Sequence, residues 1–220
     1  MTSTTATRPA STAMYQVLGA ISYGEHKAWE GAKQAAQESD DSETTAEWRK
    51  IAADELRHYK GFTRRLSDLG GDPERAMAPF IASLDTYHSS KHADPLTEAV
   101  WGYVGEGVAD DLLTWFRKVA DPETAKFVDS VIADEVEHEA RAARELESLM
   151  GHSLSKKLSA GRAARSQIVH MISSGGDSGL AKFLAFVRVG KPHELVAAVV
   201  GGYTRRMHAV GLTATGIPFR

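Results

Sequence analysis

The stretch Ala53-Asp54-Glu55-Leu56-Arg57-His58 occurs a second time, with two changes, as Ala133-Asp134-Glu135-Val136-Glu137-His138. A Gly-Glu pair precedes each copy, Gly24-Glu25 before the first and Gly105-Glu106 before the second. The copies keep register, because Glu55 and Glu135 are 80 residues apart, as are His58 and His138. The chain therefore repeats one pattern, a glutamate followed 29 or 30 residues later by Glu-x-x-His.

Both copies fall on predicted helices, where side chains three residues apart lie on the same face. One Glu-x-x-His pair is weak evidence, since such pairs also arise by chance on exposed faces. Two copies in register, on the apolar stripes of their helices, point to a shared site. Carboxylates buried there without partners cost several kcal/mol each, so they need compensating cations or protons. The candidate metal ligands are Glu25, Glu55, His58, Glu106, Glu135 and His138.

Four carboxylates and two imidazoles in this arrangement are the set with which a four-helix bundle holds two metal ions in its core. Oxygen-rich coordination with one nitrogen per ion suits iron or manganese. We expect two iron ions, with a manganese–iron pair as the alternative. A metal-bound histidine usually donates its other N–H to an acceptor that orients the ring. The candidate acceptors, for which a plain surface position stays open, are Asp54, Asp134 and Asp110.

Glycines flank two of the candidate glutamates. Gly24 precedes Glu25, and Gly105 and Gly107 stand on either side of Glu106. Two interpretations stay open: these glycines leave room for an oxygen-derived ligand or substrate, or they allow two helices to pack closely.

Helical periodicity runs through the chain, and no stretch alternates like a strand. Four helices are predicted over residues 13–38, 42–70, 95–120 and 122–150, with aspartate N-caps or Asp-Pro starts. Short loops make two antiparallel hairpins, and residues 71–94 form one long crossover whose apolar part, residues 76–81, packs across the bundle. Further helices are expected at 154–173, 180–187 and 192–210. The predicted domains are a disordered arm (1–12), the bundle (13–150) and a helical extension packed on it (151–220).

Composition narrows the chemistry. The chain has 220 residues, of which 42% are hydrophobic and none is cysteine. The absence of cysteine excludes disulfides, thiolate zinc, iron–sulfur clusters and a thiol nucleophile. No run approaches the roughly 18 apolar residues that a membrane span needs. We expect a cytoplasmic protein with no membrane span and with no flavin, haem or iron–sulfur cluster, whose oligomeric state, a homo-oligomer included, is open.

Charge is distributed unevenly. The net charge of −3 combines an acidic part, residues 1–150 with 16 Lys and Arg against 27 Asp and Glu, and a basic part, residues 151–220 with 10 against 2. The basic residues indicate either a phosphate-tracking surface for a tRNA-like substrate or a basic layer that docks on the acidic bundle. They include Lys156, Lys157, Arg162, Arg165, Lys182, Arg188, Lys191, Arg205 and Arg206.

With these residues in place, the chain resembles the ferritin-like di-iron carboxylate superfamily. Residues 54–58 read as the Asp-Glu-x-Arg-His signature of its oxygen-activating members, and residues 134–138 are a near copy with Glu for Arg. Residues 77–81 with Leu84, Asp85 and His88, residues 103–107 and residues 204–207 are similar to actinobacterial ferritin-like proteins related to the tRNA-modifying non-haem di-iron hydroxylase (MiaE-like). The resemblance implies an all-α, ferritin-like four-helix bundle with one long crossover between its second and third helices, plus C-terminal helices.

Departures from other members of the superfamily narrow the function. Storage ferritins have a single Glu-x-x-His, rubrerythrins add a cysteine iron module, and ribonucleotide-reductase-type proteins have a radical tyrosine where this chain has Phe62. The resemblance therefore implies a monooxygenase that uses O₂ as co-substrate to hydroxylate a modified tRNA base or a small apolar substrate. Its electrons come from an external ferredoxin or reductase.

Two alternatives remain open at this point. The first is a ferroxidase or peroxide-detoxifying protein with no organic substrate. The second is a metal-stabilised binding protein without turnover. The residues that carry the chemistry are in each case the metal ligands, and the sequence does not identify a substrate-binding residue.

Overall fold

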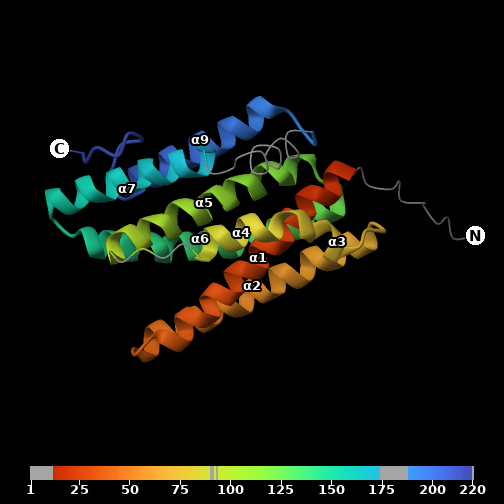
Figure 1. Cartoon of the computed structure of the whole chain (residues 1–220), viewed down its shortest axis with the longest axis horizontal. Coiled ribbons are helices and arrows are strands. Elements are labelled where there is room, and N and C mark those ends of the chain that lie inside the picture. Colours follow the sequence, from red (N-terminus) through yellow and green to blue (C-terminus); the bar gives the residue numbers. More distant parts are fainter. Residues whose placement is uncertain (1–11, 90–91, 93, 174–187, 220) are drawn as a thin grey trace, which may run out of the picture. The chain divides into compact units, whose positions relative to one another are not determined.

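The computed structural model describes residues 12–89, 92, 94–173 and 188–219, and every regular element in these ranges is a helix (Figure 1). The all-α prediction is confirmed. Contacts divide the chain into two compact units, one ending at His88 and the other beginning at Ser89. The predicted arm lies outside the described residues except for Thr12, which begins α1, and the predicted helix at 180–187 lies outside them altogether.

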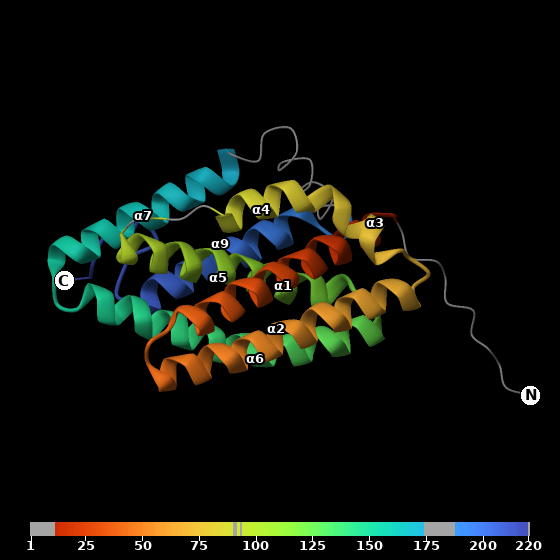
Figure 2. The same cartoon turned by 60° about the horizontal axis from the view of Figure 1, so that its bottom comes forward.

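The first unit is built on the hairpin of α1 (Thr12–Glu38) and α2 (Ser42–Asp68), which run side by side in Figures 1 and 2. Asp41 caps α2, because its carboxylate accepts a hydrogen bond of 2.7 Å from the Thr44 amide,. The apolar stripes meet between the helices and bury Leu18, Phe62 and Leu66. Both helices match their predicted ranges, since the turn chemistry of residues 39–41 leaves one place for the chain to reverse.

The long crossover is itself helical, which the sequence pattern did not indicate. It consists of α3 (Pro73–Met77), the 3₁₀ turn η1 (Ala78–Phe80) and α4 (Ile81–Ser89). Its apolar part packs on α1, and Met77 and Phe80 are buried. The close approach needs Gly19 on α1, because a Cβ there would collide with the backbone carbonyl of Ala76.

This contact makes a stability prediction with a matched control on the same helix. Gly19→Ala is expected to destabilise the protein by about 1–3 kcal/mol, because the α3 backbone cannot yield as a side chain can. Gly31→Ala, where a Cβ meets nothing within 4 Å, is expected to stabilise it by about 0.5–1 kcal/mol through its helix propensity. Urea denaturation measures both changes. Equal effects of the two substitutions would contradict the assigned packing.

The second unit begins with another hairpin, α5 (Pro95–Val119) and α6 (Pro122–Met150). Each helix has an aspartate N-cap directly before its proline: the Asp94 carboxylate accepts from the Thr97 amide, and Asp121 accepts from the amides of Glu123 and Thr124. Proline fits the first helical turn because the amide it lacks has no partner inside the helix. The Asp-Pro pairs therefore start both helices where the sequence predicted.

Two C-terminal helices, α7 (Leu154–Ser173) and α9 (Pro192–Ala209), pack against α5 within this unit (Figure 2). They share one hydrophobic cluster with α5 and α6, which includes Val100, Tyr103, Leu146, Ala160 and Met207. The predicted helices at 154–173 and 192–210 are confirmed. No helix in the described part of the chain is both long and apolar enough to cross a membrane.

Candidate metal centre

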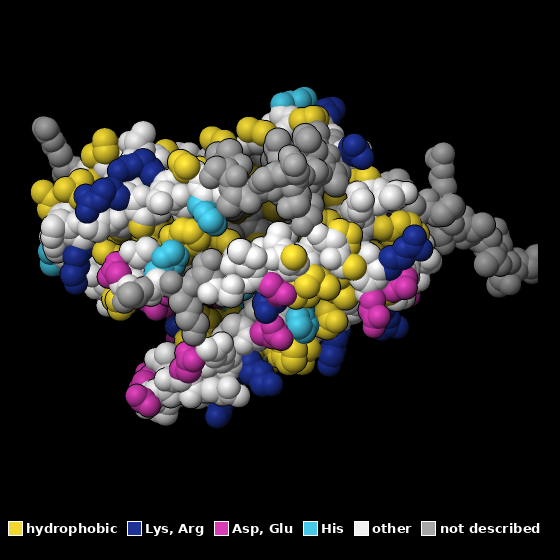
Figure 3. Space-filling model, in the orientation of Figure 1, with side chains coloured by type: hydrophobic (Ala, Val, Ile, Leu, Met, Phe, Trp, Pro, Cys, Tyr) yellow, Lys and Arg dark blue, Asp and Glu magenta, His cyan; other side chains and the backbone are white. Residues whose placement is uncertain are grey.

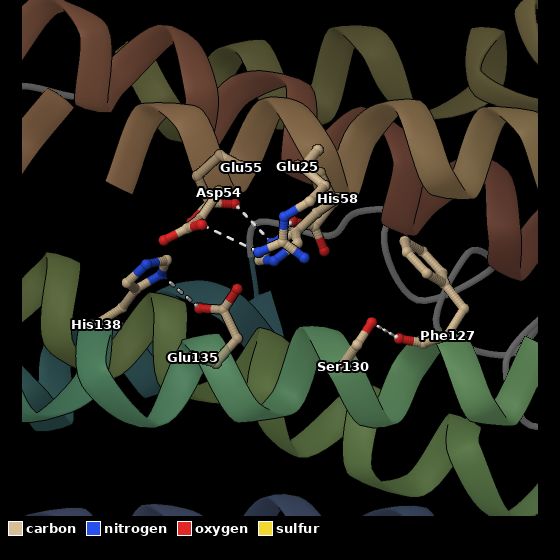
Figure 4. Close-up of polar contacts among 9 residues, drawn as sticks. Glu25, Asp54, Glu55, His58, Phe127, Ser130, Glu135 and His138 are labelled. Atoms are coloured by element: carbon tan, nitrogen blue, oxygen red, sulfur yellow. Dashed lines mark hydrogen bonds and ion pairs between the residues drawn. The ribbon is translucent and has the colours of Figure 1, made fainter. Parts of the chain in front are cut away.

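The first unit brings three candidate ligands together, which we call the first half-site: Glu25 of α1 with Glu55 and His58 of α2 (Figure 4). Nδ1 of His58 lies 3.3 Å from Oε2 of Glu25 and 3.5 Å from Oε2 of Glu55. One donor atom from each residue lies within 4.8 Å of the other two. A single ion could therefore contact all three residues after small side-chain adjustments.

The first half-site is buried. The exposed fraction is 8% for Glu25, 5% for Glu55 and zero for His58. Two carboxylates so close together, away from water, repel one another unless a positive charge lies between them. Two carboxylates and one imidazole are donors that suit divalent iron or manganese. The first half-site thus fits the ion that the sequence predicts.

The second unit carries the other three predicted ligands, which we call the second half-site: Glu106 of α5, and Glu135 and His138 of α6. Nδ1 of His138 lies 3.1 Å from Oε2 of Glu135, and Figure 4 shows both side chains leaving the same face of α6. His138 is buried and Glu135 is half-buried. In both units the same imidazole atom, Nδ1, faces the glutamate three residues earlier, so the repeat in sequence is also a repeat in geometry.

Glu106 differs from its expected position on a buried stripe. The side chain is exposed, while Val104, Gly107 and Asp111 of the same helix are buried. The reason is that α5 is covered by α6, α7 and α9 within its unit, and these neighbours bury a face that excludes Glu106.

Asp110 stands one turn beyond Glu106 in a strongly acidic surrounding. Desolvation raises the pKa of its carboxyl well above the usual range, and the charges of Glu135, Glu106 and Glu139 raise it further. Like charges close together disfavour ionisation, and a cation reverses the effect. Asp110 therefore lies in the acidic surroundings of Glu106, Glu135 and Glu139, which the charge of Arg206 partly offsets.

Sequence reasoning missed one buried ion pair beside the second half-site. Arg206 of α9 donates to both carboxylate oxygens of Asp111 on α5, with Nη2–Oδ2 at 2.5 Å and Nη1–Oδ1 at 3.3 Å. Nη1 also lies 3.6 Å from Oε2 of Glu139 on α6. Burial raises the pKa of Asp111, although its hydrogen bond with Arg206 acts in the opposite direction.

A signal for this pair was present in the sequence. Asp111 falls on the apolar stripe of α5, seven residues after Val104 and four before Trp115. A carboxylate on such a stripe predicts a buried cation. Gly107 and Gly202 complete the signal, because a Cβ at Gly107 would collide with Arg206 and one at Gly202 would collide with Asp111.

The same contacts decide between the two interpretations of one glycine. The space beside Gly107 is filled by the Arg206 side chain, so that glycine serves close packing and leaves no room for a ligand. Gly24 is different, since a Cβ there would meet nothing within 4 Å. Close packing is therefore the role of Gly107, whereas both interpretations stay open for Gly24.

The aspartates before the two glutamates have separate surroundings. Asp54 accepts a hydrogen bond of 3.0 Å from Arg57, one turn further along α2. Asp134 is half-buried on α6. Their predicted part in orienting the histidine rings stays a prediction, as does that of Asp110.

The basic C-terminal residues fall into an exposed group and a buried one. Figure 3 shows Lys and Arg side chains over α7, where Lys156, Arg162 and Arg165 are exposed. Arg206, in contrast, is only 1% exposed and faces carboxylates of α5 and α6. At Arg206 the interpretation as a basic layer on acidic helices is correct, whereas α7 keeps a basic surface. Lys182 lies outside the described residues.

A family model described as "Ferritin-like domain, actinomycetes" matches residues 10–164, which include all six candidate ligands and end within α7. Comparison with curated proteins finds no match.

Proposed function

Because the chain belongs to the ferritin-like domain family of actinomycetes, we propose that its two half-sites together hold a dinuclear iron centre that activates O₂. The observation that carries the proposal is the doubled geometry, in which each unit turns a histidine Nδ1 towards a glutamate oxygen at 3.1–3.5 Å. A repeated donor set of this kind is what a ferritin-like bundle uses for two ions.

Each residue has a defined task in this proposal. Glu25, Glu55 and His58 hold one ion, and Glu106, Glu135 and His138 hold the other. Two bound iron ions would supply electrons and open coordination positions for the reaction of O₂ with a substrate. The four carboxylates would offset the charge of the ions, and Phe62, which is buried one turn after His58 on α2, would help to exclude water. A manganese ion in one position would be held by the same donors.

Electrons for such a reaction have to come from outside the chain. The sequence has no cysteine for an iron–sulfur cluster, so a ferredoxin or a reductase is the proposed donor. The proposed reaction is the hydroxylation of a modified tRNA base or of a small apolar compound. The exposed basic residues of α7 support the first substrate class, since lysine and arginine side chains track phosphates.

The test is oxygen incorporation from ¹⁸O₂ by the reduced, iron-loaded protein. Two panels are offered, tRNA that carries hypermodified bases and small apolar compounds, and mass spectrometry follows the label. The expected result is ¹⁸O in a product of one panel, with at most one O₂ consumed per two electrons supplied.

Two other results would replace the proposal. O₂ uptake that oxidises the iron but labels no product in either panel would leave a ferroxidase or peroxide-consuming protein. Protein that contains no stoichiometric metal after anaerobic iron loading would leave a binding protein without turnover.

A further inference from the structure

We infer that Arg206 is a positioning residue of the metal centre. Its contacts with Asp111 of α5 and Glu139 of α6 fix the two helices that carry the second half-site. The inference rests on the proposed function and deepens it. Arg206 belongs to α9, beyond the residues 10–164 that the family model matches. The inference therefore gives the C-terminal region a part in the site.

The pattern of its contacts is the first argument. Arg206 packs on Gly107, pairs with Asp111 and lies 3.6 Å from Glu139. Each of these residues immediately follows a candidate ligand or Asp110: Gly107 follows Glu106, Asp111 follows Asp110, and Glu139 follows His138. One guanidinium thus contacts α5 and α6 at residues directly adjacent in sequence to Glu106, Asp110 and His138.

The second argument is that the surrounding residues hold the Arg206 side chain in one conformation. Arg206 is 1% exposed and Asp111 is 4% exposed, and a planar guanidinium that donates two hydrogen bonds to one carboxylate is fixed in orientation as well as in position. Gly107 and Gly202 clear the space for the pair. The Tyr103 hydroxyl donates a hydrogen bond of 3.1 Å to the carbonyl of Arg206, which ties its backbone to α5.

The third argument is the positive charge that Arg206 brings to the second unit. Arg206 brings a buried positive charge to α5 and α6, where its Nη2 lies 2.5 Å from Oδ2 of Asp111 and its Nη1 lies 3.6 Å from Oε2 of Glu139. By pairing with Asp111 and Glu139, the guanidinium would leave Glu106, Glu135 and His138 as the donors for an ion.

The test compares metal binding by Arg206→Met and by its neighbour Arg205→Met. Arg205 is the matched control, because it has the same charge and its Nη2 lies 3.7 Å from Oδ1 of Asp111, but its side chain is 74% exposed. Mn²⁺ is titrated into metal-free, full-length protein, and the EPR signal of the free ion gives the number of sites and their affinities. Partners that orient metal ligands typically change affinity 10- to 100-fold. We expect Arg206→Met to weaken one of two sites by about that factor, and Arg205→Met to leave both unchanged.

A double variant separates the effect of Arg206 on metal binding from its effect on the stability of the fold. Asp111→Asn with Arg206→Met removes both buried charges, so its melting temperature should lie closer to that of the wild type than that of Arg206→Met does. Its affinity for Mn²⁺ should stay low, because Glu139 and Gly107 still lack their partner. Recovery of the affinity together with the stability would overturn the inference, as would wild-type affinities in Arg206→Met. Failure of the wild type itself to bind Mn²⁺ would instead contradict the proposed function.

Discussion

Replacing His58 with alanine is expected to reduce the iron content from two ions per chain to one and to abolish most O₂ uptake. The imidazole is the only nitrogen donor of the first half-site, and Glu25 and Glu55 cannot supply a second one. Loss of a residue that merely orients a ligand costs about 10- to 100-fold in affinity, so loss of the ligand itself should cost at least about 100-fold. Anaerobic iron titration and stopped-flow O₂ consumption measure the two effects.

The repeat provides both a parallel experiment and a control. His138→Ala should have the same effect on the second ion, because His138 faces Glu135 as His58 faces Glu55. Glu137→Gln is the matched control, since it changes one charge in the second copy but lies on an exposed part of α6. Two ions per chain and full O₂ uptake in His58→Ala would refute the assignment of the first half-site. Loss of the ions and of O₂ uptake in Glu137→Gln would show that the two measurements respond to charge alone.

Metal loading is expected to raise the melting temperature by about 10–20 °C. A ligand that binds only the folded protein adds about 2.7 kcal/mol when its concentration is 100 times its dissociation constant, so two ions add about 5 kcal/mol. A change of 1 kcal/mol shifts the midpoint by about 2–4 °C in a chain of this size. The stabilisation follows from the acidic half-sites, which repel themselves in the metal-free protein and are neutralised by the ions.

Calorimetry with Mn²⁺ and then with EDTA measures this shift and its reversal. The variant that combines Glu55→Ala with His138→Ala removes one ligand from each half-site and should show a shift below about 2 °C. The melting temperature of this variant without metal is compared with that of the metal-free wild type, so that any change in the fold is measured separately. A similar rise with Mn²⁺ in the wild type and in the double variant would mean that the ions act elsewhere on the surface.

The helices and the ligands could be predicted because their causes are local. Asp41, Asp94 and Asp121 each cap the helix that follows, using atoms three residues away or closer, and a spacing of three residues puts Glu55 and His58 on one face whatever the rest of the chain does. The repeat then made Glu135 and His138 equivalent to them. The predicted pairs of glutamate and histidine lie together in each unit.

The helices of the crossover at residues 71–94 could not be predicted, because their cause is not local. Its helices α3 and α4 have five and nine residues, which is too short to be stable alone and too short to show an apolar stripe over several turns. They form because Met77 and Phe80 are buried and because Gly19 lets the α3 backbone touch α1. Such helices depend on packing with a distant part of the chain.

The donor atoms of the proposed centre follow from the order of the residues, since a histidine and a glutamate one helical turn apart meet in any helix. The contacts and the exposure of the residues around those donors do not follow from the order of the residues. Arg206 reaches Asp111 across 95 residues of sequence, and the exposure of Glu106 depends on which helices cover α5. Both are consequences of packing between distant helices, which selects one partner for a buried charge from the many that the sequence would allow.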